Sequence, residues 1–199
     1  MSSFRRAGTE TLFSCSWLTL SAHSLEDAAR NPVAHRVYTV DMADWVNVLA
    51  LTPARELVLV RQHRFGIEGD SLEIPGGLLD PNEDALDAAK RELREETGFE
   101  SDRWESFGWS HPNPALQGNR LHTFVAHNAV ERHALSLDPL EDCRVERLPL
   151  ADLPRALRQG QIRHALVLVA LYELLLAEHG VPVHTHASID PIHRTEPTV

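Results

Sequence analysis

The chain has 199 residues, 43% of them hydrophobic, and a formal net charge of −10. This length fits one domain with a short appended segment, and the apolar content is sufficient for a core. A strongly acidic chain repels polyanions, which argues against nucleic acid or an anionic membrane as a partner. A small phosphorylated ligand is not excluded, because a few arginines or a metal ion can neutralise it locally.

The cysteines and the most apolar segment predict a soluble, cytoplasmic protein. Cys15 and Cys143 are far apart and belong to no Cys/His metal-binding spacing, so we expect ordinary thiols in a reducing compartment. The N-terminal residues lack the long apolar run of a signal peptide. The most apolar segment, residues 165–177, is too short to span a bilayer and contains Glu173, so it predicts a buried helix.

Three regions follow one another along the chain. Residues 1–32 form an arm with strand-like pieces, residues 33–179 form the main domain, and residues 180–199 form a Pro- and His-rich tail that we expect to be mobile. β-Branched and aromatic residues predict strands at 33–40, 44–52, 56–65, 72–77, 103–110, 120–128 and 144–150. Helices are predicted at 80–97, 150–160 and 161–180. Strands mixed with a few helices, without regular alternation, indicate an α+β or mixed α/β fold.

The helix that begins near residue 80 has clear start and stop signals. Asp80 is the expected N-cap, Pro81 fits the first helical position, and Glu83 completes a capping-box pattern. Gly98 fits the position at which the helix stops. The apolar stripe that we expect to face the core consists of Leu86, Ala89 and Leu93.

Three carboxylates gather on one face of this helix. Glu92, Glu95 and Glu96 lie within an arc of about 100 degrees at the helical repeat, so they repel one another. Such a cluster suits a hard divalent cation, which prefers oxygen ligands. The competing interpretation is a solvated acidic helix paired with basic residues of the same helix. We expect Arg91 to point away from the three carboxylates and to support the geometry of the site.

A wider pattern includes these glutamates. Its members are Gly77, Glu83, Arg91, Glu92, Leu93, Glu95, Glu96, Gly98 and Phe99. The pattern resembles the Nudix box at every position. This resemblance implies an α/β/α sandwich with a mixed central sheet and an N-terminal β arm. It also implies an enzyme that hydrolyses a nucleoside diphosphate linked to another moiety, with Mg²⁺ as the cofactor and Mn²⁺ as a possible substitute.

The resemblance also assigns roles to residues in and beside the box. Glu92, Glu95 and Glu96 are the implied metal ligands, and Gly76, just before the box, adds its backbone carbonyl. Glu95 and Arg91 are the members of the box that we expect to take part in catalysis.

A general base is expected on the acidic loop that precedes the strand at 144–150. Glu141 falls where related enzymes place a catalytic carboxylate. Asp142 and Glu146 are alternatives, because the base must reach the attacking water and the sequence does not contain that distance.

The end of the strand at 56–65 predicts contacts with the substrate. Arg64 and Arg61 suit phosphate oxygens because a guanidinium fork matches their geometry, although surface salt bridges are the alternative. Glu73 is expected either to touch a ribose or to orient Arg64.

Outside the box, residues 60–66, residues 72–77 and Pro114 resemble the ADP-ribose pyrophosphatase branch. This implies ADP-ribose or another ADP-sugar as the substrate, AMP and a sugar phosphate as products, and a homodimer with the arm in its interface. Two features depart from that branch: Gly76 replaces the usual alanine, and the loop 111–124 resembles a related branch. The alternatives are GDP-mannose, NADH or a dinucleoside polyphosphate as substrate, or a nucleotide-binding regulator without turnover.

Overall fold

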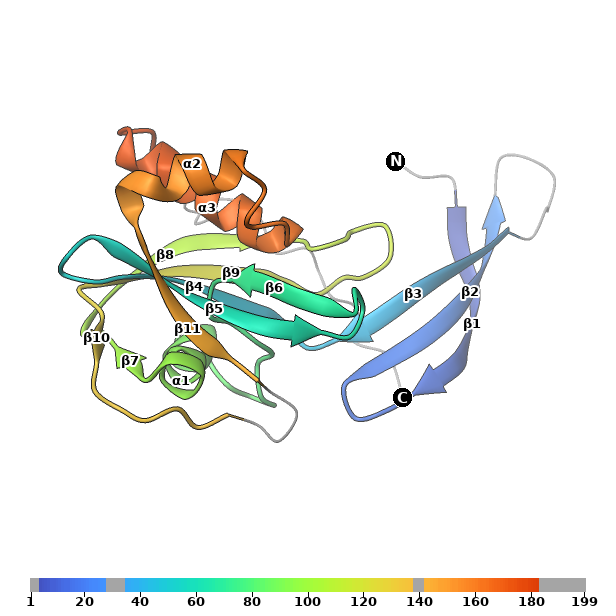
Figure 1. The fold of residues 1–199 in the computed structure, drawn as a ribbon. Helices are drawn as coiled ribbons and strands as arrows, with labels where there is room; N and C mark the ends of the chain where they lie inside the picture. Colours follow the sequence, from blue (N-terminus) through green and yellow to red (C-terminus); the bar gives the residue numbers. More distant parts are fainter. Residues whose placement is uncertain (1–3, 28–34, 138–141, 183–199) are drawn as a thin grey trace.

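The computed structural model describes residues 4–27, 35–137 and 142–182. Its body is a central sheet between helices, and a separate sheet projects from the body as an arm (Figure 1). The tail predicted from residue 180 lies outside the described residues from 183 onward. None of the helices in the described ranges is long and apolar enough to cross a membrane.

The arm is an antiparallel sheet of β1 (Phe4–Ser14), β2 (Leu18–Asp27) and β3 (His35–Met42), in that order. Every residue of β1 is exposed, and the buried residues of these three strands are the central ones of β2, at 21–23. β3 pairs with β2, so the arm sheet includes residues that the sequence assigned to the main domain. The domain boundaries themselves remain a prediction.

The central sheet has the strand order β11-β5-β4-β9-β8, with β6 paired to β5 outside this path. Its members are β4 (Trp45–Leu51), β5 (Glu56–Arg64), β6 (Gly69–Glu73), β8 (Arg103–Ser110), β9 (Leu121–His127) and β11 (Arg144–Pro149). β4 and β9 run parallel, whereas the other pairs are antiparallel, so the predicted mixed sheet is confirmed. β7 (Phe99–Glu100) and β10 (Val130–Glu131) form a separate small ribbon.

Helices cover both faces of the central sheet, which gives the predicted α/β/α sandwich (Figure 1). α1 (Ala85–Thr97) lies on one face. A 3₁₀ turn (Leu150–Asp152), α2 (Leu153–Arg158) and α3 (Ala165–Glu178) lie on the other.

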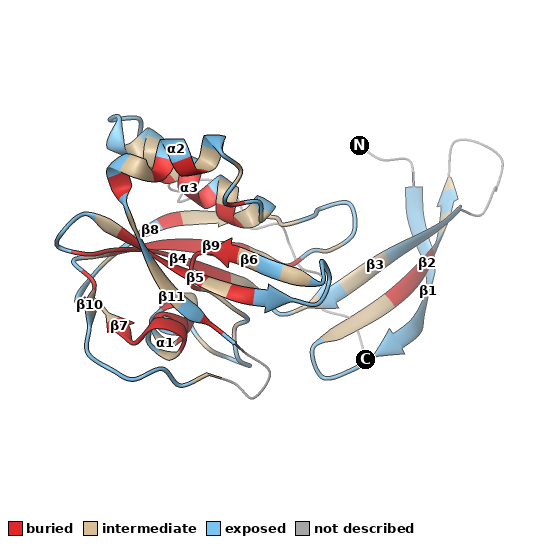
Figure 2. Ribbon diagram, in the orientation of Figure 1, coloured by how far each residue is buried: buried red, intermediate tan, exposed pale blue. Residues whose placement is uncertain are grey.

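Each face of the sheet has its own apolar core, as the buried residues in Figure 2 show. Alternate residues of a strand point to opposite faces, so in β4 Val48 packs toward α1 and Leu49 toward α3. Ala89 and Leu93 of α1 are fully buried, as the predicted apolar stripe requires. Full burial of one such leucine stabilises the fold by about 1.5–3 kcal/mol, so these positions hold α1 firmly against the sheet.

The start of α1 differs from the prediction. The helix begins at Ala85, and its N-cap is Asp84, whose carboxylate accepts a hydrogen bond from the backbone N–H of Leu86. Asn82 has a φ of 65°, which a right-handed helix cannot accommodate, so the helix cannot begin at Asp80. The Asp80 N–H does donate to Glu83, as in a capping box, but this contact closes a turn before the helix.

The segment after β6 also differs from the prediction, because the strand expected at 72–77 ends at Glu73. The chain instead runs along the edge of β4, where the N–H groups of Val46 and Val48 donate to the carbonyls of Gly77 and Pro75. A Cβ at Gly76 would lie 2.2 Å from the Val46 carbonyl oxygen, so only glycine allows this close approach.

α1 ends as predicted. Gly98 adopts a φ of 72°, in the left-handed region that glycine favours, and its N–H bonds to the carbonyl of Arg94. The long helix predicted at 161–180 is also present, over the shorter range of α3.

Candidate active site

The predicted site residues come from two neighbouring parts of the fold. α1 carries the glutamates and Arg91, with the loop at 74–79 beside it. β5 and β6 carry Arg61, Arg64 and Glu73.

Arg91 lies among the carboxylates of α1, so the prediction that it points away from them is wrong. Its Nη1 donates to Glu92 at 2.8 Å and to Glu95 at 3.2 Å. Its Nε donates to one oxygen of Glu83 and its Nη2 to the other, both at 2.9 Å, and Nη2 also donates to the Leu78 carbonyl. The helical repeat predicts only the direction of the Arg91 Cβ atom. The long side chain bends away from that direction, and its planar guanidinium reaches several acceptors at once.

These contacts change the proton affinities within the cluster. The hydrogen bonds from Arg91 hold the pKa of Glu83 below its usual range. The same bonds to Glu83, and then the charge of Glu92, raise the pKa of Arg91. At neutral pH Arg91 is therefore a permanent cation paired with an ionised Glu83.

Two of the glutamates are buried against the loop that precedes α1. Glu96 is 2% exposed and Glu92 is 9% exposed. The Gly76 N–H donates to Glu96 at 2.9 Å, and a Cβ at Gly77 would lie 2.4 Å from a carboxylate oxygen of Glu92. Burial of a carboxylate is costly unless it is paired. The two glycines therefore make a cradle that is shaped around these two carboxylates.

Arg64 and Glu73 form a second charged cluster. Arg64 donates from Nε and Nη2 to the two Glu73 oxygens, at 3.0 and 2.8 Å. The Glu73 side chain is 4% exposed, whereas that of Arg64 is 46% exposed. Of the two roles predicted for Glu73, this contact supports the orientation of Arg64.

The electrostatics connect this pair to α1. Burial by itself raises the pKa of Glu73, but the hydrogen bonds and charge of Arg64, with Ser71 and His164, outweigh it and lower that pKa overall. The hydrogen bond to Glu73 raises the pKa of Arg64, and the charge of Glu96 adds to this shift. Arg64 therefore lies within electrostatic range of the buried carboxylate of α1.

Arg61 has a different partner. It donates to Glu146 of β11 from Nε at 2.5 Å and from Nη2 at 3.2 Å. This observed salt bridge is the alternative that the sequence left open for Arg61, and it also engages Glu146, one of the three candidate bases. Asp142 is exposed and lies 3.9 Å from Arg144, and Glu141 lies outside the described residues.

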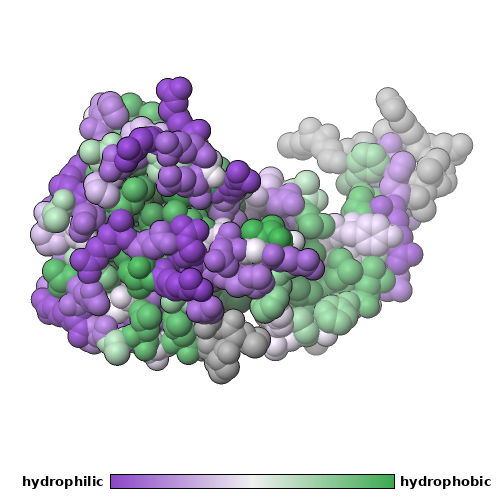
Figure 3. Space-filling view, viewed as in Figure 1, coloured by the Kyte–Doolittle hydropathy of each residue, from purple (hydrophilic) through white to green (hydrophobic). Residues whose placement is uncertain are grey.

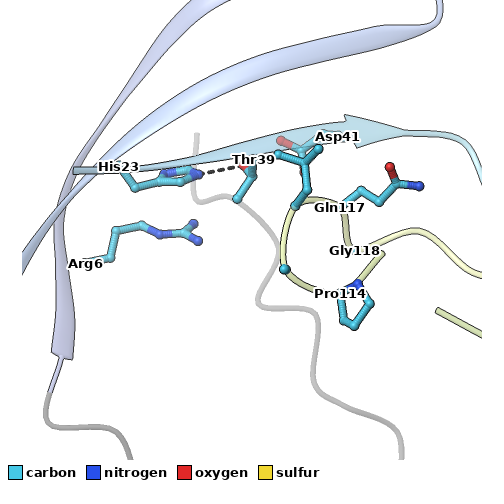
Figure 4. Close-up of a pocket in the computed structure, with 9 residues that line it drawn as sticks. Arg6, His23, Thr39, Asp41, Pro114, Gln117 and Gly118 are labelled. Carbon is cyan, nitrogen blue, oxygen red and sulfur yellow. Dashed lines mark hydrogen bonds between the residues drawn. The ribbon is translucent and has the colours of Figure 1, made fainter. Parts of the chain in front are cut away.

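Pro114 lines a cavity of about 250 Å³ between the arm and the loop after β8 (Figure 4). The Val40 N–H of β3 donates to the Leu116 carbonyl, which ties this loop to the arm. Across the cavity, His23 is bonded through its two ring nitrogens to Thr9 and Thr39, and burial and then Arg6 lower the pKa of His23. The loop 111–124, which departs from the ADP-ribose pyrophosphatase branch, is therefore in contact with the arm.

Comparison with known proteins assigns the family. The family model described as the NUDIX domain matches residues 43–169, more than half of the chain. The chain belongs to the Nudix family. The prediction that it is a Nudix hydrolase acting on a phosphoanhydride is therefore confirmed.

Several relatives share this Nudix region. A methanol dehydrogenase activator of Bacillus methanolicus is 31% identical over 67% of this chain and 72% of its own length. An ADP-ribose pyrophosphatase of Bacillus subtilis (strain 168) is 29% identical over the same shares. The ADP compounds hydrolase NudE of Escherichia coli (strain K12) is 29% identical over 58% of this chain and 62% of its own.

A solved structure supports the fold. The crystal structure of an ADP compounds hydrolase superposes with a TM-score of 0.77 at 23% identity, covering 92% of this chain and 98% of that one. This likeness extends beyond the Nudix region, because 92% of the chain is more than residues 43–169 contain.

The residues of this Nudix box suit a divalent ion by their chemistry. Their side chains offer oxygen ligands, which Mg²⁺ and Mn²⁺ prefer. The absence of a Cβ at Gly77 leaves the space that the Glu92 carboxylate occupies. Over the part of the chain that the structure describes, no three acidic, His or Cys side chains already converge on one point. Instead, Arg91 Nη1 bridges Glu92 and Glu95, so an ion held by these two carboxylates would compete with this partner.

One residue beside the site was missed by the sequence reasoning. His164 is the N-cap residue of α3, and its Nδ1 lies 3.6 Å from a Glu73 oxygen. No motif contains it, and it lies inside the range predicted as one long helix. The available signal was weak: a histidine precedes an apolar helix at a position where Ser, Thr, Asp or Asn is usual.

Proposed function

We propose that this Nudix protein hydrolyses ADP-ribose or a related ADP-sugar to AMP and a sugar phosphate. The observation that carries the proposal is the proximity of two opposite charges. The carboxylates of α1 exceed their arginine partner in number. Glu96 accepts from the N–H of Gly76, three residues after Glu73, the partner of Arg64. A cation on the carboxylates and the guanidinium of Arg64 can then bind the same diphosphate. The names of two relatives, an ADP-ribose pyrophosphatase and an ADP compounds hydrolase, support the ADP half of the substrate.

Mg²⁺, or Mn²⁺ in its place, is the proposed cofactor. Glu92, Glu95 and Glu96 are its proposed ligands, with the carbonyl of Gly76 as a further one. When bound, the ion supplies neutralisation of the diphosphate and a more acidic water. Without the ion, Arg91 Nη1 bridges Glu92 and Glu95, so the ion would compete with this guanidinium for the two carboxylates.

The chain's own residues orient the substrate and move the proton. Arg64 keeps N–H groups that Glu73 does not use, and these suit a phosphate oxygen. Glu141 is the proposed base: it takes a proton from water while a new oxygen–phosphorus bond forms and the bond to the other phosphate breaks. Glu146 is less suited because Arg61 holds both of its oxygens. Asp142 is the remaining alternative.

A homodimer is proposed from the surface of the arm. Large apolar side chains are exposed there, and Figure 3 shows apolar surface along this part of the molecule. They include Phe4, Leu12, Phe13, Trp17, Val37 and Tyr38. A contiguous apolar surface of this kind marks a protein interface. A second copy of the chain that covers this surface would lower the exposure of these side chains.

A cytoplasmic location stays a prediction from composition.

The test is turnover of a panel of substrates with Mg²⁺. The panel contains ADP-ribose, ADP-glucose, GDP-mannose, NADH and a dinucleoside polyphosphate, with Glu96→Gln as the inactive control and Glu105→Gln on β8 as the matched surface control. Phosphate released after phosphatase treatment of the products measures turnover. We expect the ADP-sugars to be the best substrates, because the named relatives act on ADP compounds.

Other outcomes distinguish the alternatives. Faster turnover of GDP-mannose, NADH or the dinucleoside polyphosphate would retain the reaction and overturn the substrate. Binding of a nucleotide without turnover would instead favour a regulator, a role that the name of the methanol dehydrogenase activator keeps as the second candidate.

A further inference from the structure

We propose that His164 is a positioning residue of the substrate site, which holds Arg64 in place through Glu73. This inference rests on the proposed function, because it assigns a role in the binding of the same diphosphate. Its basis is a row of three side chains from three elements: His164 at the start of α3, Glu73 at the end of β6, and Arg64 at the end of β5.

The first observation is an unsatisfied ring nitrogen. Nδ1 of His164 is buried and has no hydrogen-bond partner in the structure, although the imidazole as a whole is 40% exposed. Buried polar atoms without a partner are rare and costly. The nearest anionic group is the Glu73 carboxylate, 3.6 Å from Nδ1, so a shift of a few tenths of an ångström makes a hydrogen bond.

The second observation is that His164 does not serve its helix. It occupies the N-cap of α3, but its side chain makes no capping hydrogen bond. Residues that cap well at this position have short side chains that accept from the first turn. His164 instead places its ring toward β6, which a short capping side chain cannot do.

The chemistry of the pair determines which ring nitrogen carries the proton. An ionised carboxylate only accepts hydrogen bonds, so the nitrogen that faces Glu73 must be the donor. Both Glu73 oxygens already accept from Arg64, and the carboxylate is buried. A further donor at Oε2, the oxygen that also accepts from Arg64 Nη2, restrains the turning of this carboxylate and of the Arg64 guanidinium bound to it. Arg64 then presents its remaining N–H groups to the phosphate in one orientation, which lowers the cost of binding.

The decisive variant is His164→Ser, because serine is the better helix cap and cannot reach Glu73. We expect an unchanged or higher Tm, a KM for the preferred ADP-sugar about fivefold higher, and little change in kcat, since the variant loses the ring donor that can close the 3.6 Å distance to the charged Glu73. His164→Asn places an amide nitrogen at the same distance along the side chain as Nδ1, so it should restore most of the wild-type KM. His127→Ser removes a histidine that pairs with Glu105 on the opposite part of the sheet, and it should leave KM unchanged.

A double-mutant cycle shows whether His164 acts through Glu73. In a Glu73→Gln background the carboxylate charge is absent, so His164→Ser should add little to the KM of the single variant. An equal fivefold increase in both backgrounds would overturn the proposal, as would a wild-type KM in His164→Ser. Absence of turnover in the wild-type protein would instead overturn the proposed function, so the two failures are distinguishable.

Discussion

Two arginines of the site hold carboxylates in different ways. Arg91 is shared among Glu83, Glu92 and Glu95, so the carboxylates outnumber the cation. Arg64 has one carboxylate partner, Glu73, which it binds with two hydrogen bonds. The first cluster contains more carboxylates than arginines, which suits a bound cation. The second is neutral as a pair, so the N–H groups of Arg64 that Glu73 does not use suit an anion. The proposed binding roles of the two clusters therefore differ with the number of carboxylates that each arginine holds.

The largest effect is expected from Gly77→Ala, because the added methyl group would displace a carboxylate of the acidic cluster. The new Cβ would lie 2.4 Å from a Glu92 oxygen, so the carboxylate must move away from its position. A displacement of this size costs about a hundredfold in kcat. Gly118→Ala is the matched control, because a Cβ there has no heavy atom within 4 Å. Equal kcat values for the two variants would show that the position of Glu92 is not critical.

Gly76→Ala tests the loop rather than a carboxylate. Its Cβ would meet the backbone oxygen of Val46 at 2.2 Å, and a backbone atom cannot turn aside as a side chain does. We expect the free energy of unfolding to fall by about 1–3 kcal/mol. Urea unfolding of this variant beside Gly118→Ala measures the difference. An unchanged stability would mean that the loop shifts freely to accept the alanine that is usual in the ADP-ribose pyrophosphatase branch.

Arg64→Lys tests the second cluster. Lysine keeps the positive charge beside Glu73 but lacks the planar fork that binds the carboxylate and a phosphate together. We expect KM for the preferred ADP-sugar to rise about tenfold with a smaller change in kcat, which steady-state kinetics measures. A rise in KM no larger than that of Arg61→Lys, the control arginine in a salt bridge, would argue against a special role for Arg64.

Arg91→Gln tests the excess of negative charge in the first cluster. The metal-free protein loses the cation shared by three carboxylates, so we expect a loss of about 1 kcal/mol in stability. Mg²⁺ should then raise Tm by more than it does in the wild-type protein, because the ion no longer competes with Arg91 for Glu92 and Glu95. Thermal unfolding in EDTA and in Mg²⁺ provides the comparison. An identical Mg²⁺ shift in both proteins would show that Arg91 and the ion do not compete.

The smallest effect concerns pH. The pKa of Glu83 is lowered in the folded protein, mainly by hydrogen bonding to Arg91. Its contribution to stability is therefore complete above the pKa of the unfolded chain and is lost as pH falls through the lower folded pKa. We expect Glu83→Gln to flatten the acid side of the stability–pH curve by at most about 1 kcal/mol, because solvent screens the pair. Parallel curves for the variant and wild type would contradict this assignment.

Local patterns predicted most of the elements. The strand over 103–110 has the predicted bounds, and Gly98 ends α1, because alternation and a left-handed glycine depend on a few neighbouring residues. The start of α1 was misplaced at Asp80, whereas the N-cap in the structure is Asp84. The φ of Asn82 decided between them, and no residue pattern contains that angle.

The sequence by itself determined the Nudix box, because the box consists of residue types at fixed spacings along the chain, and the resemblance of the box to the Nudix family implied the mixed α/β/α fold. Only the tertiary structure decided which side chains meet. It placed Arg91 among the glutamates, Arg61 on Glu146 and His164 beside Glu73. His164 and Glu73 are 91 residues apart, as their numbers show, and belong to different layers of the sandwich. Spacing along the chain cannot specify such a contact, because it depends on how the packed layers bring the ends of α3, β5 and β6 together.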